Sequence, residues 1–262
     1  MPHAKPKLGQ NFLIDEGARR HIAAALGDLI QRTVIEIGPG QGAITDLIAP
    51  RCRHLIAIEL DRDLAPALAA RYRDRFNVTI LEADVLRTDL VALIPPGEAA
   101  DVIGNIPYYI TSDILLHLFA AATHLHRAVL MMQREVAERV AATPGTRDYG
   151  LLSATTQLHA RVETLFTLPP SAFRPSPKVD STVLRLTFAP RFTELNVDPA
   201  GFDRLLKQSF AQKRKTLHNN LRAAGHSPES LAAAWPTMIP RAARAESLTL
   251  DQMSLLYHAL NA

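Results

Sequence analysis

The sequence predicts an α/β fold, in which helices flank a mainly parallel β-sheet, followed by a small all-helical module. Short β-branched runs alternate with helical stretches through the first two thirds of the 262 residues, which is typical of a parallel sheet. One of these runs ends in the glycine turn Gly38-Pro39-Gly40-Gln41-Gly42. Beyond Pro190 only helical patterns remain. We therefore expect two domains, residues 1–190 and 191–262, with the boundary near 190–197.

The elements of the sheet domain follow one another in chain order. Asp15 is placed to cap a first helix that runs to Leu26. Parallel strands alternating with helices are then expected, with strands at 34–37, 55–58, 78–82, 102–103 and 128–132 and helices at 43–49, 62–73 and 111–121. Helices at 134–142 and 150–158 and two late antiparallel strands at 161–167 and 179–187 complete this part.

The remaining segments are a proline-rich loop and the C-terminal helices. Residues 168–177 contain four prolines in ten positions, which predicts a stiff, non-helical loop between the two late strands. Thr249 and Gln252 have the spacing of a capping box at the start of the last helix. The helices of the second domain are expected at 201–210, 212–223, from Ser227 onward and at 250–260.

Composition narrows the class of protein. A hydrophobic content of 47% and a charged content of 21% are ordinary for a globular protein. No apolar stretch is long enough to span a membrane, and Met1–Lys5 has no apolar signal region, so we expect a cytoplasmic protein. The single Cys52 excludes an internal disulfide, and no metal site is predicted. Flanking arginines could lower the pKa of this thiol, but Cys52 does not follow a strand end.

The charge is unevenly placed along the chain. Residues 1–188 carry 20 Lys and Arg against 20 Asp and Glu, whereas residues 189–262 carry 9 against 6. The focus of this excess is Lys213-Arg214-Lys215. Such a run is either a solvated helix face or a contact with a polyanion such as nucleic acid.

Polar groups follow four successive strands of the expected sheet. Glu59 ends the second strand, 19 residues after Gly40, where a Rossmann-like half places its ribose acceptor. The Gly-x-Gly-x-Gly spacing favours a nucleoside without a pyrophosphate. Asp84 and Asn105 follow the third and fourth strands. Because ligands of such sheets bind at the carboxyl ends of the strands, these groups outline a nucleoside site, with Asp84 on an adenine amino group.

The quartet Asn105-Ile106-Pro107-Tyr108 suits a reaction on an exocyclic amine. The lone pair of such an amine is delocalised into its ring and must be freed. The Asn105 side-chain oxygen and the Ile106 carbonyl can accept its two N–H groups, Pro107 fixes the turn, and Tyr108 offers a π face to the base. A bland alternative is an Asx-Pro turn with a packed tyrosine.

The chain resembles the ribosomal RNA adenine dimethyltransferase family over nearly its whole length, from Leu8 to Tyr257. Within that family it is most similar to the bacterial members that modify two adjacent adenosines near the 3′ end of small-subunit (16S) rRNA. The matching segments are Gln10-Asn11-Phe12-Leu13, Glu36 to Gly42, Glu59, Asp84, Asn105 to Tyr108, Phe173-x-Pro175-x-Pro177-x-Val179-Asp180-Ser181 and Lys213 to Leu217.

The resemblance implies a class I methyltransferase fold, S-adenosylmethionine as cofactor and a role for each matching position. Asn11 and Leu13 would contact the cofactor, Gly38 and Gly40 its methionine portion, Glu59 its ribose and Asp84 its adenine. Asn105 would lie beside both the cofactor and the target amine. Tyr108 and Phe173 would sandwich a flipped adenine, with Ile106 and Pro107 beside it. The basic residues Lys213, Arg214 and Lys215 would bind RNA.

Two alternatives remain open from the sequence. One is a methyltransferase of the macrolide-resistance type, which modifies large-subunit rRNA. The other is a mainly non-catalytic assembly factor of the ribosome. The expected partners are small-subunit rRNA and the assembling small subunit, and the protein is expected to be a monomer without membrane association.

Overall fold

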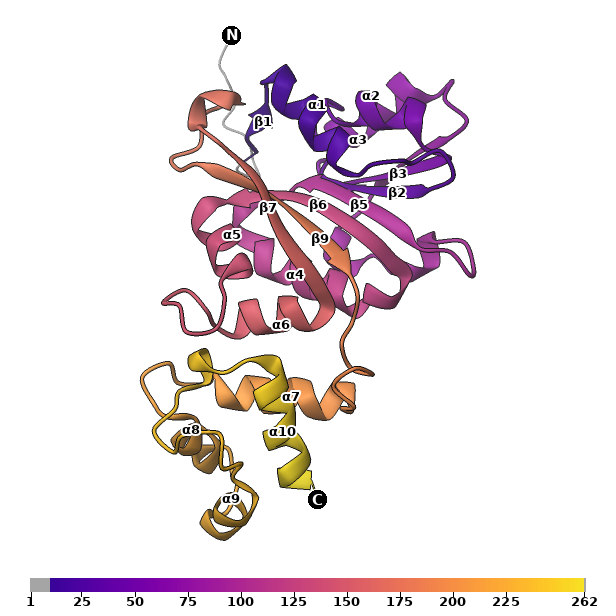
Figure 1. The fold of residues 1–262 in the computed structure, drawn as a ribbon. Helices are drawn as coiled ribbons and strands as arrows, with labels where there is room; N and C mark the ends of the chain where they lie inside the picture. The colour runs from indigo at the N-terminus through magenta and orange to yellow at the C-terminus, as the bar shows by residue number, and fades with distance from the viewer. Residues whose placement is uncertain (1–9, 262) are drawn as a thin grey trace. The chain divides into compact units, whose positions relative to one another are not determined.

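A seven-stranded mixed sheet organises the first part of the chain (Figure 1). The computed structural model describes residues 10–261, so Met1–Lys5 and the start of the resemblance at Leu8 lie outside the described residues. The strands lie in the order β4-β3-β2-β5-β6-β9-β7. Their bounds are β2 (Thr33–Ile37), β3 (His54–Glu59), β4 (Val78–Glu82), β5 (Ala100–Asn105), β6 (Leu125–Gln133), β7 (Ala160–Leu168) and β9 (Ser181–Phe188).

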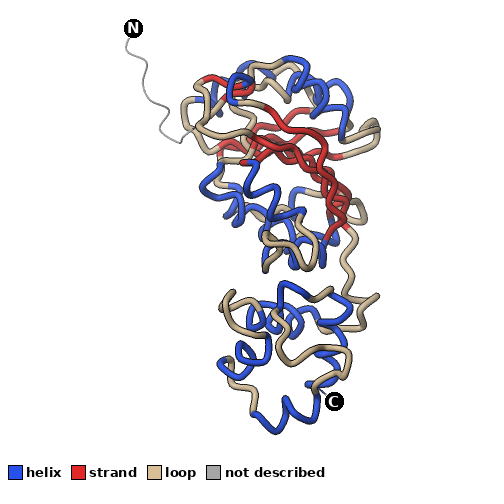
Figure 2. The backbone as a smooth tube through the Cα atoms, turned by 60° about the vertical axis from the view of Figure 1, so that its left-hand side comes forward, coloured by secondary structure: helices blue, strands red, loops and turns tan. Residues whose placement is uncertain are grey.

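The pairing of the strands confirms the predicted α/β class. β2, β3, β4, β5 and β6 pair in parallel, whereas β9 runs antiparallel to β6 from Arg127↔Thr187 to Gln133↔Ser181. Helices cover both faces of the sheet (Figure 2). The helices up to this point are α1 (Glu16–Ala25), α2 (Thr45–Ile48), α3 (Leu64–Tyr72), α4 (Thr111–Ala120), α5 (Arg134–Ala141) and α6 (Leu151–His159).

Local signals set several helix ends. The Asp15 carboxylate accepts a hydrogen bond from the Ala18 amide at 2.8 Å, which confirms the predicted cap of α1. The helix expected over 43–49 is shorter. It comprises only α2, followed by a 3-10 turn over Ala49–Arg51 that contains Pro50. Proline lacks the N–H that an α-helix needs and clashes with the preceding turn, so α2 ends before it.

Burial of β-branched residues holds the sheet in place. Every residue of β2 is buried, as expected for a strand covered on both faces. On one face, Ile22 of α1 and its C-cap residue Leu26 join a core cluster that also contains Val34, Ile103 and Val129 of the sheet. The central strands are therefore fixed, and with them the polar residues at their carboxyl ends.

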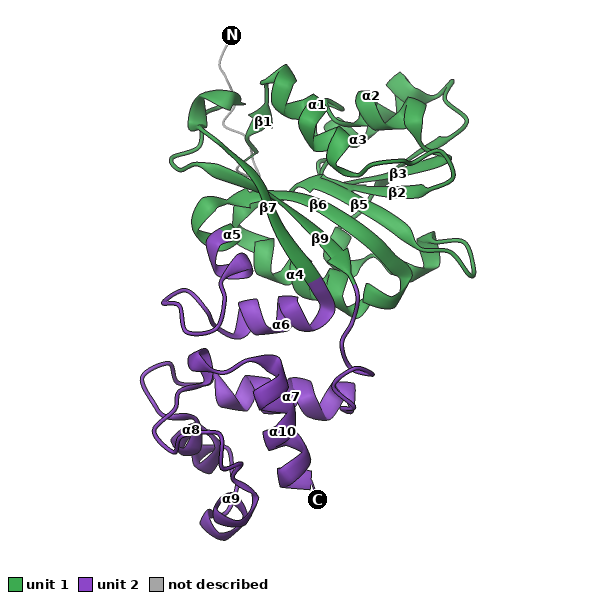
Figure 3. Ribbon diagram, in the orientation of Figure 1, with its two compact units in different colours: residues 1–137, 161–188 green, residues 138–160, 189–262 purple. Residues whose placement is uncertain are grey.

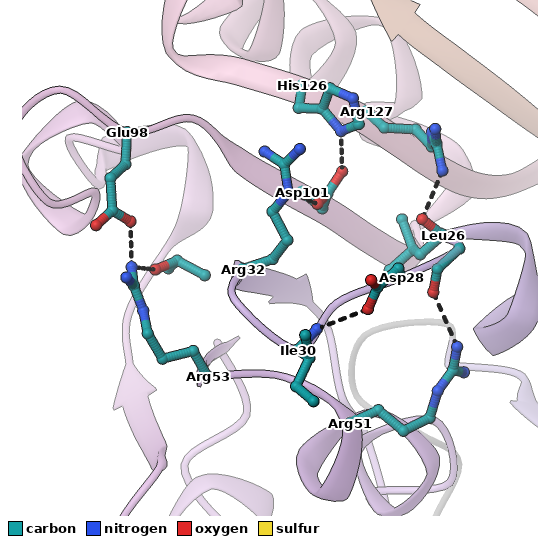
Figure 4. Close-up of polar contacts among 12 residues, drawn as sticks. Leu26, Asp28, Ile30, Arg32, Arg51, Arg53, Glu98, Asp101, His126 and Arg127 are labelled. Carbon is teal, nitrogen blue, oxygen red and sulfur yellow. Dashed lines mark hydrogen bonds and ion pairs between the residues drawn. The ribbon is translucent and has the colours of Figure 1, made fainter.

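A polar network occupies the amino ends of the strands, opposite the carboxyl ends (Figure 4). Asp101, at the start of β5, is 1% exposed and contacts His126 at 2.9 Å. Arg51 donates to the carbonyls of Ala23 and Gly27 at the end of α1, each at 3.0 Å. A cationic group at a helix C-terminus satisfies free carbonyls and interacts favourably with the helix dipole, so the Arg51 contacts stabilise the end of α1.

The chain forms two compact units that differ from the expected contiguous domains (Figure 3). Residues 138–160 group with residues 189–262 rather than with the sheet. Tyr149 and Leu158 belong to the same buried cluster as Phe202, Leu206 and Leu256, so this segment packs with the C-terminal helices. The expected division into residues 1–190 and 191–262 does not assign residues 138–160 to the second unit. Packing between segments that are distant in the chain leaves no local pattern in the sequence.

The second unit is built from short helices. Besides α6 and the end of α5, they are α7 (Pro199–Ser209), α8 (Leu217–Ala223), α9 (Pro228–Ala234) and α10 (Leu250–Asn261). The predicted capping box of α10 is confirmed, because the Gln252 side chain accepts from the Thr249 amide at 3.0 Å and the Thr249 hydroxyl accepts from the Gln252 amide at 3.2 Å. No helix within residues 10–261 is long and apolar enough to cross a membrane.

Candidate functional site

A cavity lies at the carboxyl ends of β2, β3, β4 and β5, all within the sheet unit. Its wall includes the expected residues at all four strand ends and closes with the leading segment Gln10 to Leu13. The predicted positions that line it are Asn11, Leu13, Gly38, Gly40, Glu59, Asp84, Asn105, Ile106, Pro107 and Tyr108. The fold thus brings together ten positions that are spread over nearly a hundred residues of sequence.

The glycine turn lets the main chain approach the cavity. Gly40 has φ 59°, in the left-handed region that favours glycine. A Cβ atom there would lie 3.1 Å from the Phe12 ring, which packs over the turn from the leading segment. Backbone conformation and close packing therefore both require glycine at this position.

Two carboxylates fix the walls beside the turn. The Glu59 oxygens accept from the amides of Gly40 and Asp61, each at 2.9 Å, and the side chain is almost fully buried. Asp84 accepts from the Leu86 amide at 3.0 Å and keeps its second oxygen 3.7 Å from the Arg87 guanidinium. A carboxylate has about four lone-pair sites, so both groups can still accept hydroxyl or amino donors from a ligand.

The Asn105 amide has a defined orientation. Its Nδ2 donates to the Asn11 carbonyl at 2.9 Å. The orientation of an Asn amide follows from its hydrogen bonds, so this contact leaves Oδ1 as the acceptor on the cavity wall. The Ile106 side chain is buried and its amide donates to the Met131 carbonyl at 3.1 Å. Only the backbone of Ile106 is therefore available to a ligand.

Tyr108 is anchored by a strand that is distant in sequence. Its hydroxyl lies 2.6 Å from the Ser181 hydroxyl at the start of β9. Burial raises the pKa of the Tyr108 phenol above its usual value, so the ring stays neutral. A neutral, half-buried ring with its edge held by a hydrogen bond can present one face to a base.

Phe173 does not reach the cavity, in contrast to the expected role in an aromatic sandwich. The ring is 2% exposed and packs in the same core cluster as Leu13. The cause is an unexpected antiparallel ribbon between β1 (Phe12–Leu13) and β8 (Phe173–Arg174), in which Leu13 pairs with Phe173. Directly paired residues project to the same face, and here that face is the core.

The basic run belongs to the other compact unit and is not helical. Lys213, Arg214 and Lys215 are exposed in a turn before α8, whose cap is Thr216, so the helix expected over 212–223 was wrong at its start. Lys213 donates to the Arg147 carbonyl at 2.9 Å. Arg214 and Lys215 have no carboxylate partner within residues 10–261.

Among the cavity residues that were not singled out from the sequence as ligand contacts, three have ionisable side chains. Arg19 of α1, Glu36 of β2 and Tyr109 all line the wall. Tyr109 is 65% exposed beside Tyr108, and two consecutive tyrosines after Pro107 were the only available signal. Arg19 carries no sequence signal, because its position depends on how α1 packs.

Glu36 is a buried carboxyl group that is only 2% exposed. The Thr45 hydroxyl donates to it at 2.7 Å. Burial raises its pKa from 4.5 to about 7, and the nearby Glu59 charge acts in the same direction. Glu36 is therefore partly protonated at neutral pH.

The described residues favour neither a reactive thiol nor a metal site. Burial raises the pKa of the Cys52 thiol to about 11 and outweighs the expected lowering by the neighbouring Arg51. The thiol stays protonated and unreactive. Within the described part of the chain, no group of three or more His, Cys, Asp or Glu side chains is placed to hold a metal ion.

The groups on the cavity wall fit S-adenosylmethionine, the cofactor that the resemblance implies. The wall combines three carboxylates, one arginine and a glycine turn. The ribose diol and the adenine amino group of the cofactor can donate to the carboxylates. Its methionine portion is narrow enough to lie against the main chain at the glycines of the turn. The cavity thus matches both the polarity and the charge of this ligand.

Comparisons with known proteins find relatives that match along the whole chain. The family model described as Ribosomal RNA adenine dimethylase matches residues 1–262. The chain is 59% identical over 257 residues to the Ribosomal RNA small subunit methyltransferase A of Acidobacterium capsulatum, covering 98% of this chain and 91% of that protein.

Two solved structures resemble it at 26% identity. A dimethyladenosine transferase from Plasmodium falciparum has a TM-score of 0.79, with 95% of this chain and 97% of that one covered. The 23S rRNA methyltransferase ErmE has a TM-score of 0.71, with 96% and 100% covered. The whole-length match to the family model and the 59% identity to a named member place this chain in the ribosomal RNA adenine dimethylase family.

Proposed function

We propose that this protein dimethylates N6 of two adjacent adenosines in a hairpin loop near the 3′ end of small-subunit rRNA. As a member of its family, the chain is an S-adenosylmethionine-dependent rRNA adenine methyltransferase. The small subunit as substrate is supported by the 59% identity to a protein named for that subunit. The choice of two adjacent adenosines rests on the resemblance described above.

The orientation of Asn105 is the observation that carries the chemistry. Its Nδ2 is occupied by the Asn11 carbonyl, so Oδ1 can accept one N–H of the target amine. The Ile106 carbonyl can accept the other N–H. Both contacts draw electron density back onto N6 as the bond to the methyl group forms. When bound, S-adenosylmethionine would supply that methyl group as an electrophile and leave as S-adenosylhomocysteine, and the cationic methylated N6 is acidic enough to lose one N–H proton to solvent.

The aromatic contribution is assigned to Tyr108, with the ring edge held by Ser181. Stacking on one such face contributes ~1–3 kcal/mol toward holding a base outside its stack. Phe173 can add a second face only if it leaves the core cluster in which it is buried. After the first transfer, rotation about the C6–N6 bond presents the remaining N–H to the same acceptors.

The direct test uses labelled S-adenosylmethionine and small subunits that lack the modification. We expect N6,N6-dimethyladenosine in the hairpin-loop fragment of the small-subunit rRNA, detected by digestion and mass spectrometry. A reaction without the protein serves as the blank, and the Asn105→Ala protein, for which we expect strongly reduced transfer, is measured in parallel. If the unmodified small subunit acquires no dimethyladenosine, the proposed function is wrong.

A second candidate substrate is supported by the structural likeness to ErmE, which is named for 23S rRNA. Parallel reactions with purified large subunits separate the two candidates. Our proposal predicts incorporation into small subunits alone. Incorporation into large subunits alone would instead assign the chain to the large-subunit class.

The second compact unit is proposed to bind RNA through the exposed turn Lys213 to Lys215. Its charges can neutralise phosphates of the assembling small subunit. We further propose that the protein acts as a monomer in the cytoplasm, where subunits are assembled, and that it contributes to subunit maturation. A non-catalytic assembly role is tested by asking whether the Asn105→Ala protein restores maturation in cells that lack the enzyme.

A further inference from the structure

Arg19 is the only Lys, Arg or His side chain on the cavity wall within residues 10–261. The other ionisable groups on that wall, apart from two tyrosines, are the carboxyls Glu36, Glu59 and Asp84. Arg19 forms no ion pair with any carboxylate in the described part of the chain. Its positive charge is therefore left facing the cavity, whereas the neighbouring Arg20 lies 3.4 Å from Glu16 on the exposed side of α1.

The guanidinium group is already held in place. Its Nε donates to the Leu13 carbonyl at 2.9 Å, and its Nη2 contacts the same oxygen. Within residues 10–261, Nη1 has no hydrogen-bond partner. An arginine anchored in this way loses little further side-chain freedom when it binds an anion, because its planar donor group is preorganised.

The position of Arg19 along the cavity indicates which part of a ligand it meets. The strands lie in the order β4-β3-β2-β5, so Asp84 and Asn105 mark opposite ends of the cavity. The Asn11 carbonyl binds Asn105, and the Leu13 carbonyl two residues later binds Arg19. Arg19 is thus tied to the end occupied by Asn105, away from Asp84.

We propose that Arg19 binds the carboxylate of the methionine portion of S-adenosylmethionine. With adenine at Asp84 and ribose at Glu59, the methionine portion extends past the glycine turn toward Asn105 and Arg19. The carboxylate is the only anionic group of this cofactor, and Arg19 is the only cation that residues 10–261 contribute to the wall. This inference concerns the cofactor alone and stands whichever rRNA is the substrate.

The test compares ligands that differ only in this group. Binding is measured by calorimetry, without RNA, for S-adenosylmethionine and its decarboxylated analogue. For Arg19→Met we expect roughly 10- to 100-fold weaker binding of S-adenosylmethionine, the scale of a lost charge-assisted hydrogen bond. The decarboxylated analogue should bind the variant and the parent protein within about twofold of each other.

Matched variants separate this role from a structural one. Arg20→Met removes a neighbouring charge outside the cavity and should leave the affinity for both ligands unchanged. Arg19→Lys keeps the charge but loses the planar fork, so its loss should be smaller and still selective for the carboxylate-bearing ligand. Thermal unfolding without ligand checks that each variant is folded, and Arg19→Lys alone suffices if Arg19→Met does not fold.

Two outcomes overturn the proposal. Equal weakening of both ligands assigns Arg19 to holding the Leu13 carbonyl. Unchanged affinity for both ligands removes it from cofactor binding. If the parent protein binds neither ligand, the use of S-adenosylmethionine itself fails, which is a distinct result.

Discussion

At the scale of single residues, the site depends on side chains that are fixed by the backbone of distant segments. Asn105 is oriented by the Asn11 carbonyl, and Glu59 is held by the Gly40 and Asp61 amides. Such contacts keep reactive groups in place before a ligand arrives. This lowers the cost of reorganisation during the reaction.

The first residue-scale prediction concerns Asn105→Ala. Loss of the Oδ1 acceptor removes one contact to the reacting amine, so kcat should fall about 10²- to 10³-fold. Affinity for S-adenosylmethionine, measured by calorimetry, should stay nearly unchanged because Glu59 and Asp84 remain. Methyl transfer at the parental rate would contradict the role of Asn105.

The second residue-scale prediction concerns Glu36 and pH. The pKa of Glu36 is about 7 in the folded protein against 4.5 ordinarily, so the folded state holds a proton that the unfolded chain has released between these values. Stability should therefore fall as pH rises from ~4.5 to ~7 and then level off. Glu36→Gln removes this loss and should gain up to about 3 kcal/mol at pH 8.

Urea unfolding at pH 5 and pH 8 measures this effect. The difference between Glu36→Gln and the parent protein should be large at pH 8 and small at pH 5. A difference that does not change with pH would show that Glu36 does not titrate in this range.

At the scale of elements, the ribbon of β1 and β8 connects the cofactor cavity with the proline-rich loop. Its pairing places Leu13 and Phe173 on the core face. The same leading segment supplies the carbonyls that bind Asn105 and Arg19. The leading segment and its ribbon therefore hold Asn105 in place and form one wall of the cavity.

Phe173→Ala tests the core position of this ring. Removing a buried phenylalanine costs about 3–5 kcal/mol, because the transfer free energy is lost and a cavity remains. Urea unfolding should show a loss of this size. Phe76→Ala is the matched control, since Phe76 is fully exposed and should change stability by less than about 0.5 kcal/mol. Parental stability of Phe173→Ala would place the ring outside the core.

At the scale of the whole molecule, chemistry and RNA contacts are assigned to different compact units. The cavity is built entirely by the sheet unit, whereas the turn Lys213 to Lys215 belongs to the helical unit. We expect changes in this turn to affect binding of the ribosomal subunit without affecting the cofactor.

The double substitution Arg214→Gln and Lys215→Gln tests this separation. Affinity for small subunits should fall, and the slope of log affinity against log salt should decrease by about 1.4–1.8, because two phosphate contacts are lost. Lys207→Gln is the control, since Lys207 already pairs with Asp203 at 2.6 Å. An unchanged salt slope in the double variant would exclude the turn from the RNA contact.

The sequence by itself determined the α/β class, the strands and the residues at their ends. These features follow from local periodicity, and parallel strands necessarily bring their carboxyl ends to one edge. Only the tertiary structure decided that Phe173 faces the core, that residues 138–160 join the helical unit, and that Arg19 lines the cavity. Each of these depends on which distant segments pack together. Such packing is set by long-range burial and strand register, for which a single sequence carries no local signal.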